Sequence, residues 1–302
     1  LAAALLLVLA PGGAPAAPTG LAWDSVTKFS MSADPSKLQP GAFDADYAAA
    51  AAEQSPSSGG GIFGQVKQVA EMEKMLQTGI AQRHYIAGSR ERTDDVVGQK
   101  ATIVDCAART ITTLDLRQKT YQVVSMDSPG GGESSGGEAM RPADARNDAQ
   151  VAISVVNTAL AAREIGGQSA NGFQSEVTIT ETSASGESHT QNADRMAYYS
   201  SYASPQPVCS HGALGIGSMP PGGRQMMQSY ATLMRALSGL GSRVHLSQSG
   251  PPLPVGKLTM YDAVSFGAAG PGVTIITERG NVRPVDAGDP VFGIPSGFIQ
   301  QH

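Results

Sequence analysis

The side chains best suited to chemistry are spread along the chain and form no metal-binding motif. The five histidines show neither a His-Glu-x-x-His pattern nor the cysteine and histidine spacing of a zinc site. They are His84, His189, His211, His245 and His302. We therefore expect each to be a surface or hydrogen-bonded side chain, and we expect no metal and no cofactor.

Two patterns resemble parts of hydrolase sites, and each has a simpler explanation. On an extended strand Cys209 and His211 would point to one face, as a thiol and its activating imidazole must, but a disulfide or a loop explains them better. Ser25 and Lys28 match Ser-x-x-Lys without the Ser-Asp-Asn and Lys-Thr-Gly partners of that motif. The sequence therefore predicts a protein that is not an enzyme.

The composition predicts a chain rich in β-structure and turns. Of its 302 residues, 41% are hydrophobic and 16% are charged, and its 36 glycines and 19 prolines favour turns over long helices. The formal net charge is −5, and no cluster of lysine and arginine supplies the basic face that nucleic acid requires. We therefore expect no nucleic-acid partner.

The first residues are typical of a secretory signal peptide. Residues 1–10 are apolar but too short to cross a bilayer as a helix, and residues 14–16 supply the small side chains of a cleavage site. We assign residues 1–16 to a signal peptide. The protein is thus expected to be periplasmic or secreted in the bacterial envelope, with no transmembrane segment.

The segment that follows the signal peptide is expected to form a flexible N-terminal arm over residues 17–60. It holds a possible strand at 21–31 and a short helix at 41–54, where an alanine run follows acidic residues. The glycine and serine run at 55–61 is typical of a linker, which separates this arm from the rest of the chain.

The chain has two cysteines, Cys106 and Cys209. In an oxidising compartment such an isolated pair is either bridged or left as two buried thiols. A bridge would close a loop of about 100 residues and would stabilise the fold by roughly 4–5 kcal/mol in the chain-entropy model. We take the pair as the candidate disulfide.

A block of short strands over residues 84–127 organises the middle of the chain. Residues 101–105, 110–115 and 120–125 are rich in threonine, isoleucine, valine and tyrosine, and hairpin-length connections join them. This pattern predicts an antiparallel meander. The glycine-rich residues 128–150 lack the lysine of a phosphate-binding loop, so they are expected to be a flexible surface insert.

The remaining elements are expected to be further strands and two helices. Strand patterns recur at 151–160, 173–182, 195–202, 257–266 and 272–280. Apolar residues at helical spacing predict helices at 62–77 and 226–237. The fold class is therefore expected to be mainly antiparallel β with helices (α+β).

Three motifs resemble an uncharacterised family of exported bacterial proteins that is similar to the LolA and LolB lipoprotein carriers. The first is a Leu-Asp…Lys-Thr-Tyr hairpin (Leu114, Asp115, Lys119, Thr120 and Tyr121). The second is an Ile-Gly-Gly…Gly-Phe hairpin (Ile165, Gly166, Gly167, Gly172 and Phe173). The third is a closing Phe-x-Ile-Pro-x-Gly-Phe (Phe292, Ile294, Pro295, Gly297 and Phe298). The resemblance implies a half-open β-barrel with a helical lid over residues 61–302.

The resemblance and the apolar helix together predict a carrier for a lipid or an acylated partner such as a lipoprotein. The residues expected to contact the ligand form one face of the helix at 226–237: Met226, Tyr230, Leu233 and Leu237. The alternative is a structural or envelope-interaction protein, in which the same helix fills an ordinary core and no small molecule binds.

Overall fold

The described residues of the computed structural model, 20–30, 39–52, 78–127, 150–183, 185–205, 244–266 and 273–301, form one large sheet. Its 13 strands follow the order β10-β7-β8-β9-β11-β12-β1-β2-β3-β4-β5-β6-β13. The strands are β1 (Gly20–Ser30), β2 (Ile80–Ala87), β3 (Arg90–Asp95), β4 (Lys100–Asp105), β5 (Thr110–Asp115), β6 (Thr120–Ser125), β7 (Gln150–Ile165), β8 (Gln168–Thr182), β9 (Ser188–Ala203), β10 (Val244–Ser249), β11 (Lys257–Phe266), β12 (Val273–Val285) and β13 (Ile299–Gln300). The helix α1 (Phe43–Ala52) and the 3-10 turn η4 (Pro290–Phe292) accompany them.

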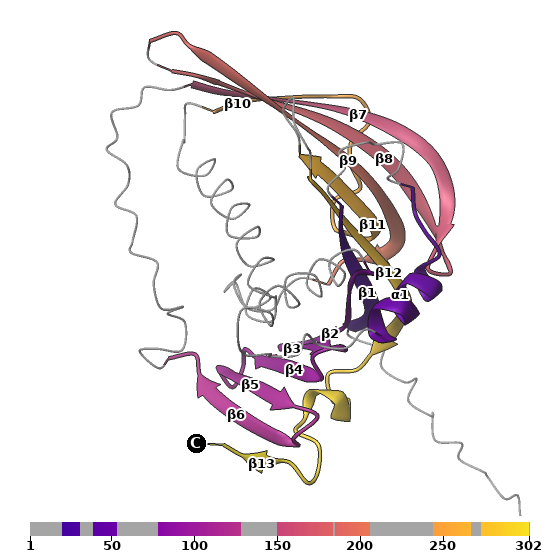
Figure 1. Cartoon of the computed structure of the whole chain (residues 1–302), viewed down its shortest axis with the longest axis vertical. Coiled ribbons are helices and arrows are strands. Elements are labelled where there is room, and N and C mark those ends of the chain that lie inside the picture. The colour runs from indigo at the N-terminus through magenta and orange to yellow at the C-terminus, as the bar shows by residue number, and fades with distance from the viewer. Residues whose placement is uncertain are drawn as a thin grey trace, which may run out of the picture.

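The sheet is antiparallel except at its two edges, and it stays open. The edge strand β10 pairs in parallel with β7, and the edge strand β13 pairs in parallel with β6. Figure 1 shows the sheet strongly bent, with α1 on its convex side. The expected α+β fold, a LolA-like half-open barrel with a helical lid, is therefore wrong. The described chain is an open mixed sheet dominated by strands.

The prediction made the long strands of the sheet too short. The two expected helices, at 62–77 and 226–237, lie outside the described residues. The strands β7, β8 and β9 are 16, 15 and 16 residues long, well beyond the usual strand length. The turn between β7 and β8 consists of Gly166 and Gly167 alone, so the two strands continue up to it on both sides.

The hydrophobic clusters of the described residues lie on one face of the sheet, while single buried apolar side chains also occur on the other. We call the face that α1 covers the outer face and the opposite one the inner face. The strand register and the alternation of side chains place all four clusters of buried hydrophobic residues on the outer face. There Val26 and Ala81 pack with Phe43 of α1, and Leu114 packs with Phe298 from the C-terminal segment.

The strand β1 lies in the middle of the sheet, between β12 and β2. The strand expected at 21–31 and the short helix expected at 41–54 are confirmed as β1 and α1. Residues 20–30 therefore belong to the sheet, and not to the flexible arm expected over 17–60.

The predicted meander is confirmed as β2 to β6, and its turns repeat every ten residues. In each of the three turns between β3 and β6 an aspartate accepts a hydrogen bond from the backbone N–H three residues later, at 2.7–2.9 Å (Asp95, Asp105 and Asp115). The residue before the next strand has a positive φ (Gln99, Arg109 and Lys119). This ten-residue period is not obvious in the sequence, because the turn geometry repeats while the residues of the strands change.

The β7–β8 turn folds back against the centre of the sheet. Gly166 and Gly167 have φ values of 53° and 75°. A Cβ on Gly166 would lie 2.5 Å from the carbonyl oxygen of Arg279 and 2.6 Å from the Cα of Gly280. The turn therefore touches β12 directly at Arg279, which belongs to the site described next.

Candidate functional site

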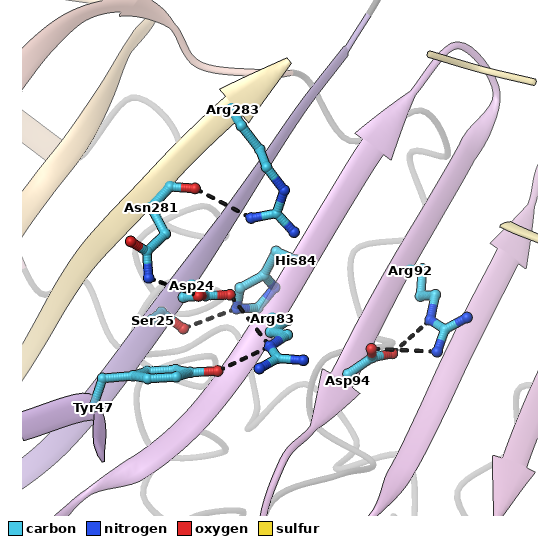
Figure 2. A network of polar contacts seen from close by, with 9 residues as sticks. All are labelled: Asp24, Ser25, Tyr47, Arg83, His84, Arg92, Asp94, Asn281 and Arg283. Atoms are coloured by element: carbon cyan, nitrogen blue, oxygen red, sulfur yellow. Dashed lines mark hydrogen bonds and ion pairs between the residues drawn. The ribbon is translucent and has the colours of Figure 1, made fainter. Parts of the chain in front are cut away.

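Three central strands bring aromatic and polar side chains together on the inner face. Trp23 and Ser25 alternate along β1, and His84 of β2 lies opposite Trp23. The rings of Trp23 and His84 stack with centroids 5.1 Å apart. His84 Nε2 lies 3.0 Å from Ser25 Oγ, as Figure 2 shows. Arg279 of β12 is the register partner of Ser25, and we call these four residues the inner-face cluster.

The imidazole of His84 is neutral at neutral pH. Burial, followed by the positive charge of Arg279, lowers the pKa of His84 to about 4. Its Nδ1 lies 3.4 Å from Thr93 Oγ1, so each ring nitrogen faces a hydroxyl group that can donate or accept. The ring is thus held between two hydroxyls, and its stacking fixes the position of the Trp23 ring.

Arg279 is a half-buried cation without an anionic partner of its own. Its Nη1 donates to the carbonyl oxygen of Thr259 at 2.8 Å, and no carboxylate of the described residues lies within ion-pair distance of it. The nearby Asp262 carboxylate already accepts two hydrogen bonds from Arg195, at 2.8 and 2.9 Å. Burial lowers the pKa of Arg279, and the Asp262 charge only partly offsets this effect.

The indole of Trp23 also has an unmet hydrogen bond. Trp23 is 8% exposed, and its buried Nε1 has no hydrogen-bond partner. An unpaired buried N–H costs roughly 1–3 kcal/mol. Arg279 carries five N–H donors on a planar group, and it makes one hydrogen bond to the part of the chain that the structure describes. The inner-face cluster therefore presents donors without acceptors, which is the chemistry of a site for an anion.

On the outer face, behind the cluster, lies a second polar network whose charges compensate each other. Asp24 accepts from Asn281 Nδ2 at 2.9 Å and lies 3.6 Å from Arg83 Nε (Figure 2). Arg83 Nε also donates to the hydroxyl of Tyr47 in α1, at 3.1 Å. Asn281 has a φ of 54° in the β12 bulge opposite Trp23. These contacts hold α1 and the β12 bulge in place. The charges of Asp24 and Arg83 balance each other, so neither is left to bind a charged ligand.

The geometry around Ser25 does not support a serine nucleophile. Ser25 is 3% exposed, and the far nitrogen of His84 faces the hydroxyl of Thr93 instead of a carboxylate. Ser25 and Lys28 are three residues apart on a strand, so their side chains point to opposite faces and cannot act as a pair. Lys28 forms an ion pair with Asp46 of α1, at 2.6 Å.

The four predicted ligand contacts and Cys209 lie outside the described residues. The contacts are Met226, Tyr230, Leu233 and Leu237. Cys106 lies in the β4–β5 turn and is not a free thiol in the structure. Its pairing with Cys209 and the contacts of the helix at 226–237 remain predictions.

Sequence reasoning missed both Trp23 and Arg279. Glu278 and Arg279 interrupt the otherwise apolar first part of β12, and a charged pair inside a strand is the signal that could have revealed the site. Trp23 is the only tryptophan of the chain. Its place on the inner face could not be inferred from the sequence, because the β12 bulge opposite it sets the register between β1 and β12.

Stability is expected to fall as the pH drops from about 6.5 to about 4, because of His84. Its pKa is about 4 in the folded protein against 6.5 ordinarily, so within this window the unfolded chain binds the proton and the folded chain does not. This group alone contributes a slope of up to about 1.4 kcal/mol per pH unit. His84→Gln should flatten the slope in urea unfolding, whereas the exposed control His189→Gln should not. Equal slopes for wild type and His84→Gln would contradict the assignment.

Among the residues described, no three histidine, cysteine or acidic side chains gather as a metal site requires. None of the described helices has the length and apolar character to cross a membrane. No protein-family model, curated protein or solved structure matches the chain. The resemblance to the LolA and LolB carriers therefore remains a prediction from its motifs.

Proposed function

We propose that this protein is a non-catalytic, exported binding protein that holds a lipid or an acylated partner against the inner face of its sheet. Its place would be the periplasm or the medium, as the expected signal peptide indicates. The buried Ser25, whose neighbour His84 faces a hydroxyl group instead of a carboxylate, makes the binding role a better fit to the site than hydrolysis.

The observation that carries the proposal is a set of large, half-buried apolar side chains on the inner face. The apolar residues of the outer face gather in four clusters around buried side chains. The inner face has buried apolar side chains of its own, such as Trp23, Val104 and Tyr199. Beside them it presents a set of large apolar side chains that are only half buried: Leu21, Phe29, Ile111, Phe173, Val177, Val264 and Ile275. Half-buried apolar side chains on a sheet face gain free energy when an acyl chain covers them.

Two measurements on the purified full chain test this function. Mass spectrometry of a solvent extract should find co-purified acyl lipid. A polyene fatty acid should accept excitation energy from Trp23, the only tryptophan, in a saturable titration. An extract without lipid, combined with a titration that does not saturate, would overturn the proposal in favour of the structural alternative with a filled core.

A matched pair of variants locates the acyl chain. Val264→Thr keeps the shape of a half-buried inner-face residue and adds a hydroxyl, so the affinity for the fatty acid should fall by roughly tenfold, within the range for an unpaired polar group. Val123→Thr makes the same change on the outer face of β6, where the side chain is 38% exposed, and should leave the affinity unchanged. Equal effects of the two changes would place the acyl chain elsewhere.

A further inference from the structure

We infer that the inner-face cluster binds a carboxylate group at the head of the ligand, with the Arg279 guanidinium and the Trp23 indole N–H as donors. This inference rests on the proposed function and deepens it, because it names the ligand as a free acid with an acyl chain. Among the described residues the Trp23 indole N–H has no partner and the Arg279 guanidinium has one, a carbonyl oxygen, so both have donors left for a ligand.

The first argument is the balance of charge around Arg279. On the inner face of the strands around Arg279, from β9 to β2 in the sheet order, two cations, Arg195 and Arg279, accompany one anion, Asp262, and the next inner-face carboxylates, Glu91 and Asp95, lie farther away on β3. Glu278 precedes Arg279 in the sequence but lies on the outer face, where its Oε1 accepts from the backbone N–H of Gly41 at 3.0 Å. A half-buried excess charge is costly, and a bound monoanion would neutralise it.

The second argument is the geometry of the donors. Ser25 is the register partner of Arg279, and Trp23 is two residues along β1 on the same face. This spacing puts the indole and the guanidinium within the reach of one small planar group. A carboxylate has two oxygens, one for each donor, and a single charge that equals the local excess. A phosphate would bring a second charge and a third oxygen for which the cluster has no donor.

The third argument is the neutral His84. Its ring stacks on Trp23 and both of its nitrogens face hydroxyl groups, so it fixes the indole without adding a charge. The anion therefore meets one cation, and the apolar inner-face residues next to the cluster are left for the acyl chain. Phe29 lies on the same strand and face, four residues beyond Ser25.

The experiment compares four ligands with the same twelve-carbon chain, each below its critical micelle concentration: dodecanoate, dodecanol, dodecyl phosphate and dodecyltrimethylammonium. The full chain is titrated with each, and the fluorescence of Trp23 reports binding. We expect dodecanoate to bind at least about tenfold more tightly than the other three, the scale of one charge-assisted hydrogen bond.

Variants of two arginines on one strand then identify the donor. In Arg279→Gln the ratio of the affinity for dodecanoate to the affinity for dodecanol should fall close to one. Arg279→Lys should keep part of the preference for dodecanoate. The control Arg283→Gln removes an exposed outer-face arginine of β12 that lies over the Tyr85 ring, and should leave the ratio unchanged. Thermal unfolding of each variant checks that it is folded, and the wild-type comparison of ligands stands even if Arg279→Gln does not fold.

The outcomes separate the inference from the function on which it rests. Binding of all four ligands with equal affinity, or a ratio that Arg279→Gln leaves intact, would overturn the inference alone. Tighter binding of dodecyl phosphate would overturn the carboxylate assignment. Binding of none of the four would overturn the proposed function together with the inference.

Discussion

Leu114→Ala is expected to lower the free energy of unfolding by about 3 kcal/mol, the usual cost of removing a fully buried leucine side chain. Leu114 of β5 is 0% exposed and packs on the outer face with Ala101, Ile103 and Phe298. The change removes buried methyl groups and leaves a cavity between the meander and the C-terminal segment. Against a typical total stability of about 5–15 kcal/mol, the loss should be plain in urea unfolding.

Leu246→Ala is the matched control for this prediction. Leu246 of β10 is 68% exposed, so the same chemical change removes little buried surface there. Its effect should stay within about 0.5 kcal/mol. Similar midpoints of urea unfolding for the two variants would mean that Leu114 is not part of a packed core. The meander and the C-terminal segment would then not share a core.

Gly166→Ala is expected to destabilise the protein by about 2–4 kcal/mol, the sum of two effects. The residue has a φ of 53°, where any residue with a Cβ is strained by about 1 kcal/mol. The added Cβ would also lie 2.5 Å from the carbonyl oxygen of Arg279, so the β7–β8 turn must move away from β12, at a cost of about 1–3 kcal/mol.

Gly167→Ala separates the two effects. Gly167 has a φ of 75°, and a Cβ built there meets no atom within 4 Å, so this variant should lose only about 1 kcal/mol. The difference between the two variants in urea unfolding measures the contact with β12. If both lose the same amount, the turn does not rest on the strand that carries Arg279. Because that contact is made at Arg279 itself, Gly166→Ala should also weaken dodecanoate binding more than Gly167→Ala.

Much of the local structure could be predicted from the sequence. The strands β5, β6 and β11 were expected at the bounds they have, and β4 begins one residue earlier than expected, because alternation of side chains and turn residues act over a few residues. The expected hairpin connections between β4, β5 and β6 are confirmed as well. Errors appeared where local signals compete. The strand patterns expected at 151–160 and 173–182 leave out the glycines at 166, 167 and 172, yet Gly172 lies within β8, where a Cβ would meet the Tyr198 ring at 2.5 Å.

The candidate site could not be predicted from the sequence, because it depends on which distant strands become neighbours. Trp23, His84 and Arg279 come from β1, β2 and β12, and the pairing of β1 with β12 joins opposite ends of the described chain. The bulge at Asn281 shifts that register by one residue. Such a shift decides the face on which each side chain lies, and long-range packing sets it.

By itself the sequence determined the local elements of this protein: a β-rich chain, a meander with tight turns, and strands with one apolar face. Alternation and turn chemistry are short-range, so residues in order suffice to reveal them. The tertiary structure alone decided that β1 lies at the centre of an open sheet, and that Arg279 meets Trp23 and His84 without an anionic partner among the described residues. Charge balance in a half-buried site depends on neighbours that only the folded chain brings together.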